Sequence, residues 1–185
     1  MRAETMALRY VEELRDLWNL ERRGAALLPR MARAASRPEV AGALRALAWV
    51  TAEQRRRLEK ILTELGTPPE HPGPSSGAGV FAMVEAELKD GARSDSRDLV
   101  LIGLAQRLAH LGQAAYGLAR TLAEKLGNSH HASELQTSLE EDAELDFRLT
   151  RLALFHIPLD EVRGPVVTPV KVDLPSQERS IESIG

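Results

Sequence analysis

Five polar residues interrupt rows of apolar side chains that are otherwise spaced for helix packing. They are Glu21, Thr51, Gln54, Asp142 and Asp146, and each lies near the middle of its predicted helix. Mid-helix positions of antiparallel helices share one layer, so these side chains are predicted to meet in the interior. Buried carboxylates are costly unless they are paired, hydrogen-bonded or bound to a metal. Dinuclear iron or manganese centres use carboxylates from several helices of a bundle in this way.

A metal-free interpretation of the same residues is favoured over a metal site. The carboxylates could accept hydrogen bonds in a buried polar network, or pair with an arginine, and so fix the register of the helices. The candidate partners in that network are Thr51, Gln54, Gln113 and Tyr116. No nucleophile–base pair, phosphate-binding glycine loop or nucleic-acid motif accompanies these residues.

The element that would organise these groups is a long predicted helix over Asp98–Gly127, which carries two adjacent apolar stripes. Both stripes repeat in steps of three and four residues, the spacing of packed helices. A helix this broadly apolar needs cover on two sides, so it is predicted in the middle of a bundle. The large stripe is Leu101, Leu104, Leu108, Leu111, Ala115, Leu118 and Leu122. The mostly small stripe is Ile102, Ala105, Ala109, Gly112, Tyr116, Ala119, Ala123 and Leu126.

Three further long helices are predicted, over Thr5–Ala35, Pro38–Leu65 and Ala132–Phe155. Ser36 is the candidate N-cap of the second, because a serine hydroxyl accepts a hydrogen bond from the first helical turn. Pro29 is expected to kink or divide the first, because proline removes a helical hydrogen bond and clashes with the preceding turn.

The connections between these helices predict the fold. A Pro-, Gly- and Ser-rich loop over Thr67–Gly79 and a short helix over Val80–Leu88 form a crossover long enough to span a bundle. Two antiparallel hairpins joined by such a crossover make an all-α, ferritin-like four-helix bundle, predicted for residues 1–157. Residues 158–185 are predicted to form an extended C-terminal tail.

The sequence resembles the YciE/YciF-like ferritin-like family from about Leu14 to Leu154. The matching segments are Leu17–Glu21, Leu28–Met31, Pro38–Glu39, Thr51–Glu59, Tyr116–Gly117, Leu122–Glu124 and Leu139–Glu141 followed by Asp146. The resemblance implies carboxylates at the centre of the bundle. The family's polar core positions fall on Glu21, Gln54, Glu141 or Asp142, and Asp146. The resemblance therefore makes Glu21, Glu141, Asp142 and Asp146 the candidate metal ligands.

The sequence departs from the family where a complete site would need ligands. No predicted helix carries a Glu-x-x-His motif, and the long helix has Ala109 and Gly112 where the family has acids. Leu47 and Val50 stand where the family tends to have acids or His on the second helix. Two metal ions need more ligands than the remaining carboxylates supply, so the metal site is predicted to be degenerate. No cofactor is expected; if a metal is bound, iron or manganese is implied.

The composition excludes several classes of function. A formal net charge of -3 gives no reason to expect nucleic acid or an anionic membrane, and Arg55–Arg57 is interpreted as a solvated face. The absence of cysteine excludes disulfides, thiolate metal sites and Cys nucleophiles. No apolar run approaches the roughly 18 residues of a transmembrane helix, and the amphipathic N-terminus does not resemble a signal peptide. A cytoplasmic location is expected.

These observations lead to three hypotheses about function. The first is a non-enzymatic, stress-associated structural or interaction protein with a degenerate metal site. The second is an iron or manganese oxidoreductase acting on peroxide or ferrous iron, with the ligands Glu21, Glu141, Asp142 and Asp146. The third is a small-molecule binder that uses the space left by Ala109 and Gly112.

Partners are predicted from exposed apolar residues and from the tail. A homodimer through exposed apolar helix faces is expected, with Trp49 as a candidate contact. The tail segment Val166–Gly185 is expected to pack as an arm on its own bundle or on a second copy, or to dock a protein partner.

Overall fold

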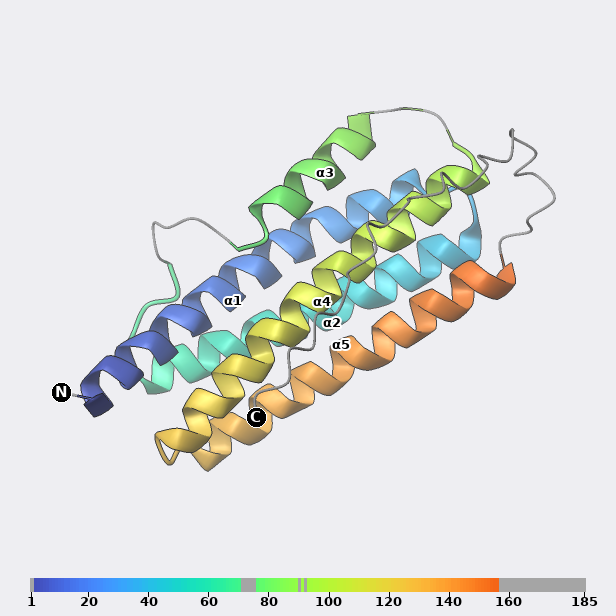
Figure 1. The fold of residues 1–185 in the computed structure, drawn as a ribbon. Coiled ribbons are helices and arrows are strands. Elements are labelled where there is room, and N and C mark those ends of the chain that lie inside the picture. Colours follow the sequence, from blue (N-terminus) through green and yellow to red (C-terminus); the bar gives the residue numbers. More distant parts are fainter. Residues whose placement is uncertain (1, 71–75, 90, 92, 157–185) are drawn as a thin grey trace, which may run out of the picture.

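The described residues form five helices, of which four are long and enclose a shared core. The computed structural model describes residues 2–70, 76–89, 91 and 93–156. The helices are α1 Arg2–Ala34, α2 Pro38–Glu64, α3 Ala78–Lys89, α4 Asp95–Lys125 and α5 Ser129–His156 (Figure 1). The predicted all-α fold is confirmed. Among these helices none is both long enough and apolar enough to cross a membrane.

The four long helices pack as two hairpins. α1 pairs with α2 and α4 with α5, while α1 also contacts α4 and α2 contacts α5, so the bundle closes on all four sides. The crossover from α2 to α4 contains α3, which lies over α1 and α4 (Figure 1). This is the predicted ferritin-like topology of two antiparallel hairpins joined by a long connection. The predicted tail, residues 158–185, lies outside the described residues.

The core consists of two apolar clusters stacked along the bundle. One cluster contains Leu28, Leu44 and Leu101, and the other contains Leu14 and Leu58. The small stripe of α4 is buried along its length, because four helices cannot approach one axis closely if all of them carry large side chains there. The large stripe is covered unevenly. Leu118 is 50% exposed, because α3 is only 12 residues long and covers a limited stretch of α4.

The starts of two helices are stabilised by side chains, and one of them differs from the prediction. Ser94 caps α4, accepting a hydrogen bond from the Arg97 N–H at 3.2 Å. The predicted Ser36 cap of α2 is wrong: Arg37 occupies the N-cap position and makes no side-chain cap. The carboxylate of Asp98, in the first turn of α4, instead binds backbone N–H groups at the start of α2. Its two oxygens accept hydrogen bonds from the Ser36 and Arg37 N–H groups, each at 2.8 Å.

α1 is not divided at Pro29, because one helix continues through that position (Figure 1). Proline inside a helix costs about 3 kcal/mol through the lost hydrogen bond and the steric clash. Leu28 and Met31 on either side of it are fully buried, so dividing the helix here would disrupt packing on the core face. Continuous packing therefore outweighs the local cost of the proline.

Candidate functional site

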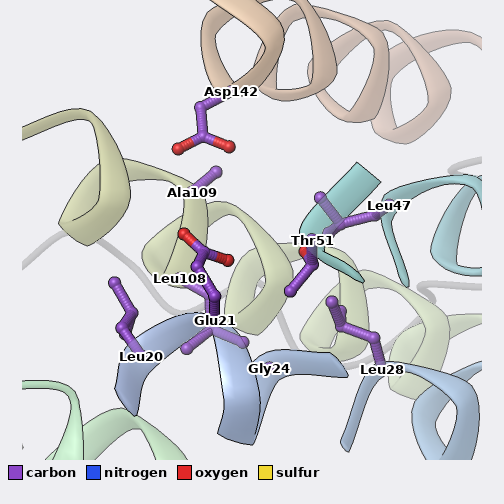
Figure 2. A pocket seen from close by; sticks show the side chains of 9 residues that line it. All are labelled: Leu20, Glu21, Gly24, Leu28, Leu47, Thr51, Leu108, Ala109 and Asp142. Atoms are coloured by element: carbon purple, nitrogen blue, oxygen red, sulfur yellow. The ribbon is translucent and has the colours of Figure 1, made fainter. Parts of the chain in front are cut away.

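A polar layer separates the two apolar clusters at the middle of the bundle. Glu21 of α1, Gln54 and Thr51 of α2, and Asp142 of α5 are all 5% exposed or less. The carboxylates of Glu21 and Asp142 point toward one another beside Ala109 of α4 (Figure 2). The prediction that mid-helix polar groups share one interior layer is therefore confirmed for these residues.

Each carboxylate in the layer accepts a hydrogen bond from a neutral donor. The Tyr116 hydroxyl donates to Glu21 Oε1 at 3.0 Å. The Gln54 amide donates to Asp142 Oδ1 at 3.0 Å and to the Ser138 carbonyl oxygen at 3.2 Å. These are contacts of the predicted polar network. Gln113 does not join it, because its buried Nε2 has no hydrogen-bond partner among the described residues.

Gly112 of α4 is required for Asp142 to occupy this position. A Cβ atom at Gly112 would lie 2.4 Å from Asp142 Oδ2 and 3.8 Å from Glu21 Oε1. Non-bonded carbon and oxygen atoms do not approach to 2.4 Å, so any larger residue would displace the carboxylate. The backbone of α4 thus forms one wall of the site, and no side chain can enter from position 112.

A small cavity lies between the two carboxylates and α2. It has a volume of about 20 Å³ and is lined by Leu20, Glu21, Gly24, Leu28, Leu47, Thr51, Leu108, Ala109 and Asp142 (Figure 2). A space of this size accommodates one water molecule where polar groups are present to bind it. It is far smaller than the roughly 300–1,000 Å³ of sites for drug-sized ligands. The geometry therefore gives no support to a small-molecule site at Ala109 and Gly112.

The electrostatics of the layer favour protonated carboxyl groups. Burial, and then the nearby charge of Asp142, raise the pKa of Glu21 well above its ordinary value, against the opposing hydrogen bond from Tyr116. Burial raises the pKa of Asp142 to about 7, although the hydrogen bond from Gln54 opposes this shift. Burial also raises the pKa of the Tyr116 hydroxyl, which stays a donor. The layer therefore retains protons under conditions in which exposed carboxylates are charged.

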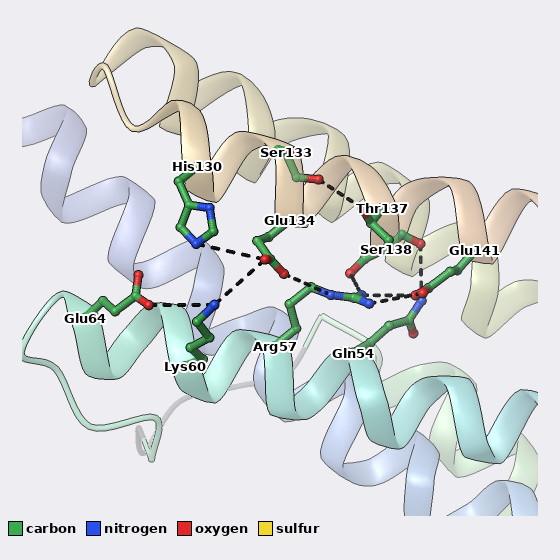
Figure 3. Close-up of polar contacts among 10 residues, drawn as sticks. All are labelled: Gln54, Arg57, Lys60, Glu64, His130, Ser133, Glu134, Thr137, Ser138 and Glu141. Carbon is green, nitrogen blue, oxygen red and sulfur yellow. Dashed lines mark hydrogen bonds and ion pairs between the residues drawn. The ribbon is translucent and has the colours of Figure 1, made fainter.

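Glu141 lies next to Asp142 in the sequence but turns away toward α2. The Arg57 guanidinium donates to its two carboxylate oxygens at 3.0 and 3.1 Å and to Ser138 Oγ at 2.6 Å (Figure 3). Burial lowers the pKa of Arg57, but the hydrogen bond and charge of Glu141 more than compensate, so the net shift is upward. The solvated-face interpretation is wrong for Arg57, whose side chain is only 17% exposed.

Asp146 faces α4 at the outer edge of the bundle. Its Oδ1 accepts a hydrogen bond from Gln106 Nε2 at 2.9 Å and lies 3.2 Å from His110 Nε2. The structure therefore brings Glu21 and Asp142 together, whereas Glu141 and Asp146 contact different helices. The four candidate ligands do not converge on one point.

A dinuclear metal centre does not fit the residues at this layer. Among the residues that the structure describes, no group of three His, Cys, Asp or Glu side chains is placed to hold a metal ion. α4 presents Ala109 and the bare backbone of Gly112 to the centre. Two metal ions bridged by carboxylates need ligands from all four helices.

Sequence reasoning missed the arginine that supports this layer from the side. Arg57 follows Gln54 by three residues, and Ser138 precedes Asp142 by four, so each lies one helical turn from a residue of the layer. That spacing was a usable signal. It could not reveal that Arg57 faces α5, because the rotation of one helix relative to another depends on how the two pack and cannot be deduced from the sequence of either helix alone.

Comparisons with known proteins agree with this architecture. A family model described as a domain of unknown function, DUF892, matches residues 5–157. Protein YciF of Escherichia coli (strain K12) is 27% identical over 158 residues, which cover 85% of this chain and 95% of that protein.

Solved structures give the same result. The crystal structure of the E. coli stress protein YciF has a TM-score of 0.75 at 28% identity, and covers 80% of this chain and 94% of that one. YcfI of Rhodopseudomonas palustris, a protein with a proposed structural role, has a TM-score of 0.74 at 25% identity, with 80% and 95% covered. The resemblance seen in the sequence is confirmed, and the chain belongs to the DUF892 family of YciF-like helical-bundle proteins.

Proposed function

We propose that this protein is a non-enzymatic, stress-associated structural protein, in which a hydrogen-bonded pair of carboxyl groups occupies the place of a metal centre. The structural and stress-related parts of the proposal rest on the relatives: YciF of E. coli is described as a stress protein, and YcfI as a protein with a proposed structural role. The metal-free part rests on the geometry of the polar layer. A cytoplasmic location is part of the proposal.

The observation that carries the proposal is the close approach of Asp142 to the α4 backbone at Gly112. The 2.4 Å separation between Asp142 Oδ2 and a Cβ at this position leaves α4 no means of supplying a ligand there. Tyr116 and Gln54 already donate hydrogen bonds to the two carboxyl groups. A carboxyl pair that is satisfied by neutral donors and partly protonated needs no cation to offset its burial.

A single bound metal ion is the second candidate, because Glu21 and Asp142 face one another across a cavity of about 20 Å³. An iron or manganese ion there would have two carboxylate ligands and would take its remaining ligands from water. This arrangement would support an oxidoreductase only if the ion were retained by the purified protein.

The two candidates are separated by metal content measured on the full chain. Protein isolated without chelators from cells supplied with iron and manganese is expected to contain well below one metal ion per chain. A metal ion that binds only the folded state would raise the melting temperature. Because the proposal includes no metal site, the melting temperature in added Mn²⁺ is expected to match that in added Mg²⁺.

The Glu21→Gln variant provides the matched control. Its amide oxygen still accepts the Tyr116 hydrogen bond, so the variant is expected to fold and to melt at or above the parent temperature near neutral pH. A full equivalent of iron or manganese that is retained by the parent and lost from Glu21→Gln would refute the structural assignment.

A further inference from the structure

A second recess lies between α2 and α5, at the end of the bundle where α5 finishes. It has a volume of about 300 Å³ and is lined by Ala43, Arg148, Arg151, Leu152 and Phe155. We call it the α2/α5 groove. Toward the other end of the bundle, Arg57 and Glu141 fill the space between the same two helices. In the groove the small side chain of Ala43 leaves that space open.

We propose that the segment Pro158–Arg163 of this chain turns back from α5 and docks in the α2/α5 groove. The segment reads Pro-Leu-Asp-Glu-Val-Arg and so combines apolar residues with two adjacent acids. In the docked arrangement Leu159 packs against Ala43, Leu152 and Phe155. The carboxylates of the segment pair with the two groove arginines.

The lengths of chain involved support this occupant. The groove begins at the last turn of α5 and extends back to Arg148, about 10 Å along the helix axis at 1.5 Å per residue. Six extended residues span about 20 Å, so the segment can cover the groove without unwinding α5. Proline is unfavourable inside a helix and disfavours helical backbone at the residue before it, so the sequence at Pro158 favours the change of direction that the proposal requires.

The exposure of the end of α5 points the same way. Phe155 is 73% exposed and lines the groove. Contiguous exposed apolar surface rimmed by polar groups is typical of an interaction site. The tethered segment reaches this surface at a high effective concentration, which no separate molecule matches.

Charge complementarity favours an acidic segment over an apolar one. Arg148 Nε donates to Glu144 at 2.7 Å, in a pair on the solvent side of α5. The Arg151 guanidinium lies 5.9 Å from the centre of the Phe147 ring. Each guanidinium carries five N–H donors, so both retain donors for Asp160 and Glu161.

The experiment uses the fact that the full chain contains no cysteine. In the double variant Ala46→Cys/Val162→Cys, one cysteine lies on α2 one helical turn after Ala43 and the other lies near the end of the docked segment, with Leu159 and both acids intact. The matched control is Val100→Cys/Val162→Cys, which places the first cysteine on the half-exposed outer face of α4 at the same end of the bundle. Circular dichroism and melting temperature establish that both variants fold.

Under mild oxidation at low protein concentration, the groove pair is expected to form an intramolecular disulfide about tenfold faster than the control pair, because docking raises the local concentration of one thiol near the other. Adding Arg148→Glu/Arg151→Glu is expected to remove this advantage, and further adding Asp160→Arg/Glu161→Arg to restore it. Equal rates for the groove and control pairs overturn the proposal. Disulfide-linked dimers as the main product, seen by non-reducing electrophoresis, also overturn it and assign the groove to a second copy.

Discussion

At the residue scale, the position of Asp142 depends on the missing side chain of Gly112. The Gly112→Ala variant is expected to lose about 2 kcal/mol of unfolding free energy, because overpacking a filled core costs about 1–3 kcal/mol. The new methyl group would force the carboxyl group away from α4 and from its Gln54 donor. Urea unfolding followed by circular dichroism measures the change.

Gly103→Ala on the same helix is the control for backbone effects. A Cβ there meets no atom of the described residues within 4 Å, so the helix propensity of alanine should stabilise the protein by up to about 1 kcal/mol. If both alanine variants change stability equally, Asp142 is not held against Gly112 as described.

Asp142 also gives the protein a specific dependence on pH. Its pKa rises from an ordinary value of 3.8 to about 7 on folding, so between these values the folded state binds more protons than the unfolded state. The contribution of Asp142 to stability is therefore most favourable below pH 3.8, and it falls as the pH rises toward about 7. We expect Asp142→Asn to remove this fall. Relative to the parent, the variant is expected to gain stability as the pH rises from about 4 to about 7. Above about pH 7 the difference in stability between the two proteins is expected to stay constant. Melting curves across this range check the prediction, and parallel curves for the two proteins would contradict it.

At the element scale, Asp98 ties the start of α4 to the turn between α1 and α2. It is fully buried, and its carboxylate accepts the Ser36 and Arg37 N–H groups at 2.8 Å each. Asp98→Asn can accept only one of these bonds and is expected to cost about 1.5–3 kcal/mol, the range for hydrogen bonds to a charged group. Asp16→Asn is the control, since Asp16 accepts a single backbone N–H at an exposed site and should change stability by less than about 0.5 kcal/mol. Equal losses in chemical denaturation would show that the Asp98 contacts are not stabilising.

Arg57 performs the corresponding role between α2 and α5. Arg57→Lys keeps the charge but loses the two-pronged contact with Glu141, and is expected to lower unfolding free energy by about 1–2 kcal/mol. Arg56→Lys, one residue earlier and 60% exposed, should be nearly neutral. Thermal unfolding of both variants tests this difference, and a neutral Arg57→Lys would remove the arginine from the account of helix pairing.

At the scale of the whole molecule, Trp49 stands out on the surface. It is 67% exposed near the middle of α2, and large aromatic side chains are enriched in protein interfaces. We expect the protein to form a homodimer through this face, and Trp49→Lys to produce a monomer in size-exclusion chromatography with light scattering. Leu8→Lys, at a residue that is 60% exposed near the far end of α1, should leave the dimer intact. A parent protein that is already monomeric would end this prediction.

Much of the fold could be predicted from the sequence because it depends on periodicity. The two stripes of α4, the five helices and the long crossover all follow from spacing and turn residues, and the buried pair Glu21 and Asp142 follows from interrupted stripes. The partner of Asp98 could not be predicted, because a carboxylate that caps another helix leaves no local pattern. The separation of Glu141 and Asp146 from the centre was hidden for a similar reason, since it depends on how α5 is rotated against its neighbours.

The contact between Gly112 and Asp142 also limits how the centre of the bundle can be changed. A carboxylate introduced at position 112 would occupy the space that the Asp142 carboxyl group now fills. The new acid could therefore be accommodated only if Asp142 were displaced. Reconstruction of a four-sided ligand cage through this position therefore requires paired replacements on opposite helices. A protein engineer who changes one residue at a time would meet a destabilised intermediate before reaching any functional cage.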